Sequence, residues 1–126
     1  MSAGRPTRTV RFVVALDGTH PERLEAEIGV RPDRTWLAMG RRMPEVRAVE
    51  GTWEIGAEGG GELGVLIRTV LSRVRTHKDS LAPVCTRADA TCSLTIVQSE
   101  ETGFALDVQD MTLLAELNAL LEVGSA

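Results

Sequence analysis

The chain has 126 residues, of which 43% are apolar and 25% charged, and its formal net charge is −4. This length and composition are typical of one soluble domain, and no apolar run approaches the roughly 20 residues that a membrane-spanning helix needs. The negative charge argues against a general nucleic-acid binder, because neutralising phosphates requires a basic surface.

We expect a flexible N-terminal tail over residues 1–8 and a single α+β domain over residues 9–126. The tail has no apolar segment of the kind found in secretory signals, which predicts a cytoplasmic protein. Apolar residues then alternate with polar or small ones over residues 9–16, the period of a half-buried strand.

A short helix is predicted over residues 21–28. Thr19 and Glu22 have the spacing of a capping box, in which each side chain binds the other residue's backbone. Gly29 fits the left-handed residue that often ends a helix.

Two strands are predicted over residues 34–39 and 51–55, joined by a long connection rich in arginine. Gly56 to Gly61 is expected to be a flexible turn, although a glycine-rich loop before a helix can also bind anions. The next helix carries an apolar stripe from Leu63 to Leu81, and Pro83 is expected to end or kink it.

The last third of the chain is predicted to be a strand over residues 90–97, a strand over residues 104–108 and a final helix. The short turn between the two strands favours an antiparallel hairpin. Asp110 is expected to cap the helix, Gly124 to end it, and five leucines to form its apolar side: Leu113, Leu114, Leu117, Leu120 and Leu121.

These elements predict a ferredoxin-like βαββαβ antiparallel sheet with helices on one face and a βα extension at the C-terminus. The other sheet face would be uncovered and would suit a homodimer contact, a partner surface or ordinary exposure to solvent. Its side chains would be Arg11, Val13, Ala15, Thr95, Val97, Ala105 and Asp107. Asp107 would matter there if Arg11 were its neighbour.

The spacing Gly29-x-x-Pro32-x-Arg34-x-Trp36, with Gly40 following and then Gly51-x-Trp53, resembles the bacterial family known as domain of unknown function 4279. The resemblance covers residues 10–121 and implies a small α+β protein with a conspicuous segment after its first helix. The family pattern includes a final strand that this chain is expected to lack. The resemblance implies a fold and the position of a site, and no reaction.

Both tryptophans of the chain, Trp36 and Trp53, lie in or beside its arginine-rich stretch. One interpretation is that both indoles are structural anchors that hold this segment against the sheet. The other is a binding site in which Trp36 forms one wall and Arg34, Arg41 and Arg42 form the rim. Guanidinium groups pair with carboxylates or phosphates and stack on aromatic rings, which suits an acidic peptide or an anionic ligand.

The chain contains two cysteines and two histidines. Cys85 and Cys92 have no zinc-site spacing, and we predict reduced thiols, no metal and no cofactor. His77 falls on an apolar stripe, which favours a core or boundary role over a role as catalytic base, and a Cys–His pair has no support in the spacing.

We therefore predict no catalytic residue and favour a non-enzymatic binding module over an enzyme. In this hypothesis Arg34, Trp36, Arg41, Arg42 and Trp53 contact a protein or acidic peptide partner, in an accessory or immunity-type role. The alternative is a small enzyme or sensor that binds an anionic small molecule in a pocket beside Trp36. A homodimer with purely structural duties is a third hypothesis.

Overall fold

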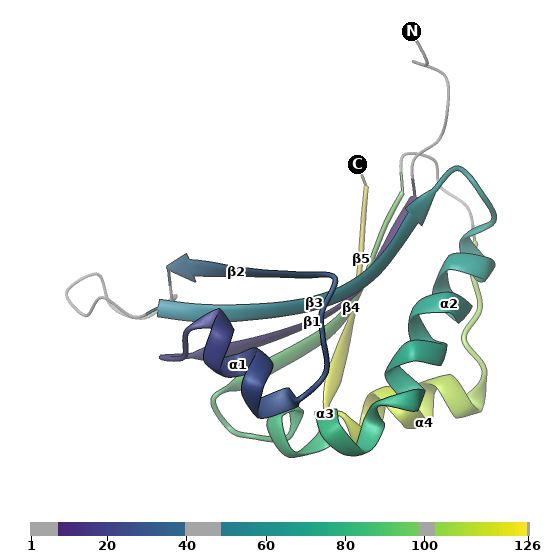
Figure 1. Cartoon of the computed structure of the whole chain (residues 1–126). Helices are drawn as coiled ribbons and strands as arrows, with labels where there is room; N and C mark the ends of the chain where they lie inside the picture. Colours follow the sequence, from purple (N-terminus) through teal and green to yellow (C-terminus); the bar gives the residue numbers. More distant parts are fainter. Residues whose placement is uncertain (1–7, 40–48, 99–102, 126) are drawn as a thin grey trace, which may run out of the picture.

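The computed structural model describes residues 8–39, 49–98 and 103–125. Within these residues the protein is an α+β fold with a five-stranded mixed sheet and four helices. The helices lie on one side of the sheet and leave the other side uncovered (Figure 1). None of the described helices combines the length and apolar character that crossing a membrane would require.

The strand order across the sheet is β2-β3-β1-β4-β5. All neighbours are antiparallel except β4 and β5, which are parallel. The ferredoxin-like assignment is not confirmed, because this order differs from the expected one. The elements are β1 (Arg8–Asp17), α1 (Pro21–Ile28), β2 (Arg34–Met39), β3 (Val49–Gly59), α2 (Leu63–Thr76), α3 (Lys78–Cys85), β4 (Ala90–Gln98), α4 (Val108–Glu116) and β5 (Ala119–Ser125).

β1 is the central strand, paired along its length with β3 on one side and β4 on the other. Its even-numbered side chains, from Val10 to Leu16, are fully buried against the helices, while the odd-numbered ones are half-buried on the uncovered face. This alternation confirms the strand predicted from the sequence, which Arg8 and Asp17 extend by one residue at each end. Residues 1–7 of the predicted tail lie outside the described residues.

The C-terminal region differs most from the prediction. α4 begins at Val108, with Asp107 and not Asp110 as its N-cap, and Asp110 completes a capping box with Asp107. The chain leaves the helix at Leu117 and turns through Asn118, which has the left-handed φ of 54°. It then forms β5, so the family's final strand is present and the expectation that it is missing was wrong.

The strand predicted over residues 104–108 was also wrong. Residues 103–107 form no strand and connect to α4, so Ala105 and Asp107 are not on the uncovered sheet face. Phe104 and Leu106 are partly buried against the core. The alternating pattern therefore reflected one-sided packing of an extended segment and not pairing with β4.

Three helix-boundary predictions also need correction. The long second helix is broken at His77 into α2 and α3, and Pro83 lies inside α3. The break lets α3 contact α1 and β4 separately from α2. α1 has the predicted bounds and a left-handed Gly29 after it, but its N-cap is His20, so Thr19 forms no capping box.

Gly56 to Gly59 belong to β3 and not to a flexible connector. β3 therefore extends beyond the point where β2 pairs with it, since the last residue of β3 paired with β2 is Glu54. Beyond Glu54 the sheet no longer includes β2, and a groove opens beside the exposed edge of β3.

Candidate functional site

The two tryptophans lie on opposite faces of the sheet. Trp53 of β3 has no exposed surface and faces the helices, where its Nε1 donates a hydrogen bond to the Val30 carbonyl at 3.0 Å. Trp36 of β2 pairs with Thr52, the neighbour of Trp53, so its indole is on the helix-free face. Trp53 is therefore a core anchor, and only Trp36, which is half-buried, has surface to offer a ligand.

Arg34 lies over the Trp36 ring, with Cζ 4.9 Å from the ring centroid. The two residues are two positions apart on one strand, so both side chains lie on the same face of the sheet. The indole face attracts the guanidinium without using up its N–H donors. Because Arg34 makes no ion pair with any described residue, those donors remain available to a ligand.

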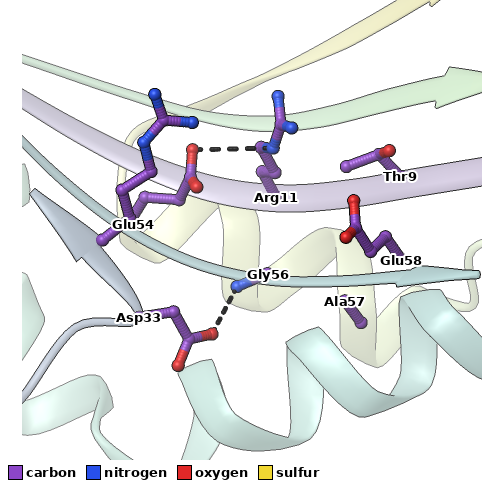
Figure 2. Close-up of a pocket in the computed structure, with 8 residues that line it drawn as sticks. Thr9, Arg11, Asp33, Glu54, Gly56, Ala57 and Glu58 are labelled. Atoms are coloured by element: carbon purple, nitrogen blue, oxygen red, sulfur yellow. Dashed lines mark hydrogen bonds and ion pairs between the residues drawn. The ribbon is translucent and has the colours of Figure 1, made fainter.

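Beside Arg34 is a groove of about 280 Å³ on the helix-free face, where β3 extends past β2 (Figure 2). It contains the two guanidinium groups of Arg11 and Arg34 and the three carboxylates of Asp33, Glu54 and Glu58. Thr9, Gly56 and Ala57 complete the lining.

Glu54 is the acidic residue at the centre of this groove. Its Oε1 lies 3.7 Å from Arg11 Nε, and the residue is 6% exposed although no helix covers this face. Burial raises the pKa of the Glu54 carboxyl, and the positive charges of Arg11 and Arg34 oppose that rise. The sequence placed Asp107 on this sheet face, where it would matter only as a neighbour of Arg11. That was wrong, because Asp107 caps α4 and Glu54 is the partner of Arg11.

Gly56 makes room for the Arg11 side chain. A Cβ on Gly56 would lie 3.3 Å from Arg11 Cγ and 3.2 Å from the Val10 carbonyl oxygen. Gly56 is directly opposite Arg11 in the β1–β3 pairing, so the arginine stem can lie across the glycine toward Glu54. The glycine-rich stretch thus shapes the groove, and its Gly56 amide binds an anion that the chain itself supplies.

That anion is Asp33, which closes the β3 edge just beyond β2. Its Oδ2 accepts from the Gly56 amide at 2.9 Å, and its two oxygens accept from Arg73 of α2 at 2.6 and 2.9 Å. The hydrogen bonds from Arg73 are the main reason that the pKa of Asp33 is lowered, and the Gly56 amide adds to the effect against the cost of burial. The Asp33–Arg73 pair was not identified from the sequence, because the two residues are 40 positions apart in the chain.

This lowered pKa predicts a pH-dependent contribution to stability. Since the folded-state pKa of Asp33 lies below its unfolded value, the contribution is fully present above the ordinary aspartate pKa of about 4 and is lost as pH falls through the folded-state value. We expect Asp33→Asn to lower stability at pH 7 by about 1 kcal/mol, as is usual for partly exposed ion pairs. Urea unfolding at a series of pH values should show the two proteins converging in acid; a constant difference would contradict the prediction.

Arg41 and Arg42, predicted to form the rim of the site, lie outside the described residues. The structure therefore brings together Arg34 and Trp36 of the predicted set, adds Arg11 and Glu54, and assigns Trp53 to the core.

The cysteines are close together in the core, where Cys92 Sγ donates to the Cys85 carbonyl at 3.8 Å. Both are free thiols, and the neighbouring Cys92 thiol together with burial raises the pKa of Cys85. Thiols held in their protonated form are poor nucleophiles. His77 is half-buried at the junction of α2 and α3. No group of three or more potential metal ligands occurs among the described residues.

Fold and site together define a small α+β protein with helices on one sheet face and an arginine–tryptophan pair on the other. A family model matches residues 5–124, and the chain belongs to that family, described as domain of unknown function DUF4279. No curated protein and no solved structure matches the chain.

Proposed function

We propose that this protein is a non-enzymatic binding module that recognises a protein or peptide partner through the helix-free face around Arg34 and Trp36. The supporting observation is the position of Arg34, which is stacked on a half-buried indole and forms no ion pair with a described residue, although its charge acts on the nearby Glu54 carboxyl. Tryptophan and arginine are the residue types that contribute most to binding energy at protein interfaces. Arg41 and Arg42, which follow in the sequence, are proposed to extend this surface.

An acidic segment of the partner would suit Arg34. A carboxylate can accept two parallel N–H bonds from a guanidinium whose face is already stacked on an aromatic ring. We place this recognition in the cytoplasm, in an accessory or immunity-type role.

The alternative is a small enzyme or sensor that binds an anionic small molecule beside Trp36. It is less favoured, because the groove next to Arg34 contains the carboxylates of Asp33, Glu54 and Glu58 against two guanidinium groups. Its lining does not include Trp36. Because Arg73 neutralises Asp33, the three carboxylates are balanced by three guanidinium groups, and a small anion would find no excess of positive charge in this groove.

Variants of the two stacked residues test the proposal. We expect Arg34→Glu and Trp36→Ala each to weaken partner binding at least tenfold, as loss of a central interface residue does. Arg68→Glu is the matched control, since Arg68 is an exposed arginine of α2 on the helix side of the sheet. Tagged wild-type and variant proteins, expressed in the native host and compared by quantitative mass spectrometry, give the readout.

The proposal requires a partner that is lost with both site variants and kept with Arg68→Glu, while circular dichroism shows all the variants folded at the temperature of the experiment. Partners retained equally by all proteins would contradict it. The small-molecule alternative is tested by tryptophan emission. Trp53 is buried, so anions that change the emission of the wild type and not of Trp36→Phe would favour the alternative.

A further inference from the structure

The edge strand β5 exposes a row of large apolar side chains. Leu120, Leu121 and Val123 are 58%, 45% and 55% exposed. β5 is the last strand of the sheet and pairs only with β4 among the described residues. Its seven residues span roughly 23 Å, long enough to pair with another strand.

Proteins that remain monomeric usually protect such an edge with lysine, proline, a bulge or a very short strand. β5 has none of these devices, and Glu122 is its only charged residue. The opposite edge strand, β2, carries Arg34 and Trp36 on its helix-free face. β5 differs in that three of its large apolar side chains are exposed, against Leu37 alone among the β2 residues whose exposure is described.

We propose that β5 pairs antiparallel with β5 of a second copy of this chain, about a twofold axis perpendicular to the sheet at Leu121. The β4–β5 register places Ala119, Leu121 and Val123 on the helix side, opposite the buried Cys92, Leu94 and Ile96 of β4. In a continuous sheet, paired residues share a face, so only registers that match helix-side residues with helix-side residues are allowed.

Among these registers, the one centred on Leu121 best complements its own sequence. It sets Leu121 against its own equivalent and Ala119 against Val123, so apolar side chains meet on the helix side. On the other face it sets Leu120 against Glu122. A register centred on Glu122 would instead oppose two like charges, which is destabilising.

The dimer would join two five-stranded sheets into one, with both helix layers on the same side. Each Arg34–Trp36 pair would lie near a far edge of the joined sheet, because β2 and β5 are at opposite ends of the strand order. The proposed homodimer contact is therefore at the β5 edge and not on the uncovered sheet face that the sequence suggested. That face stays free, so the dimer does not depend on the proposed partner binding.

Opposite charges placed at one position test this register. We expect sedimentation equilibrium of the wild type to give twice the chain mass of 13.6 kDa at micromolar concentration. Leu120→Glu sets a carboxylate against Glu122 of the second copy and should raise the dimer dissociation constant by about tenfold or more. Leu120→Lys sets an ammonium there and should keep the dimer. The two variants alter the same exposed side chain, so a simple loss of leucine would affect them equally.

Leu37→Glu is the control on the other edge, where Leu37 is 48% exposed, and it should remain dimeric. The double variant Leu120→Glu/Glu122→Lys restores opposite charges and should regain the dimer. It keeps the test valid if Leu120→Glu alone folds poorly by circular dichroism. A monomeric wild type, or Leu120 variants of equal dimer affinity, would overturn the proposal.

Discussion

Replacing Gly51 with alanine is expected to lower the free energy of unfolding by about 3 kcal/mol, the upper part of the usual range for overpacking. A Cβ at this position would overlap the Thr19 carbonyl oxygen and lie 3.0 Å from the His20 carbonyl carbon. These atoms belong to the backbone between β1 and α1, which cannot rotate away as a side chain could. Urea denaturation followed by circular dichroism measures the change.

Gly64→Ala is the control for this prediction. Gly64 is in the first turn of α2, and no atom lies within 4 Å of its would-be Cβ. Alanine there should be neutral or stabilise the protein by up to about 1 kcal/mol, because it favours the helix. If both substitutions had the same effect, the close backbone approach at Gly51 would not be what requires glycine.

Trp53→Ala is expected to cost about 3–5 kcal/mol, the range for removing a buried tryptophan. The substitution leaves a cavity beneath the sheet and removes the hydrogen bond from Nε1 to the Val30 carbonyl. Domains of this size are stable by only about 5–15 kcal/mol, so the variant should unfold at a much lower temperature. Calorimetry gives the shift.

Trp36→Ala provides the comparison, since the same chemical change is made on the other face of the same sheet. Trp36 is half-buried and its indole is on the helix-free face, so we expect its loss to cost less than half as much. Equal destabilisation by the two substitutions would mean that both indoles serve the core, and would remove the basis for assigning recognition to Trp36.

The structure gives a physical reason for one sequence feature of this family member. In Gly51-x-Trp53 the glycine admits the backbone that precedes α1, and the indole two residues later faces the same side and binds the segment after α1. The pair thus fixes both ends of α1 against β3. The Gly51-x-Trp53 motif therefore stabilises the fold. Trp36, from the preceding Gly29-x-x-Pro32-x-Arg34-x-Trp36 segment, is half-buried at the surface.

Elements with one clear periodicity were predictable from the sequence. β1, α1 and β4 each have a clear pattern of buried positions, and their predicted bounds, like those of β2, agree with the structure to within a residue. The C-terminal leucines were ambiguous, because Leu113, Leu117, Leu120 and Leu121 fit one helical stripe. The structure divides them at Asn118 between a helix and a parallel edge strand. Only packing decides that division, since it depends on β4 being available as a neighbour.

The candidate site was predictable in part. The sequence assigned Arg34 and Trp36 to one candidate site, and in the structure the Arg34 guanidinium lies over the Trp36 ring. Its position on the helix-free face depends on the β2–β3 register, and no short-range pattern fixes that register across residues 40–48. Asp33, Glu54 and Arg73 were missed for the same reason, because their partners come from strands and a helix distant in the sequence.

The order of the strands also has a consequence for how the chain folds. The central strand β1 is made first, yet its neighbours begin only at Val49 and Ala90. During translation the apolar residues of β1 therefore remain without their sheet partners until β3 and β4 have emerged from the ribosome. Such distant pairings slow folding and leave an aggregation-prone segment exposed in the meantime. Chains truncated before β4 should accordingly depend on chaperones more than chains that include β4 and β5.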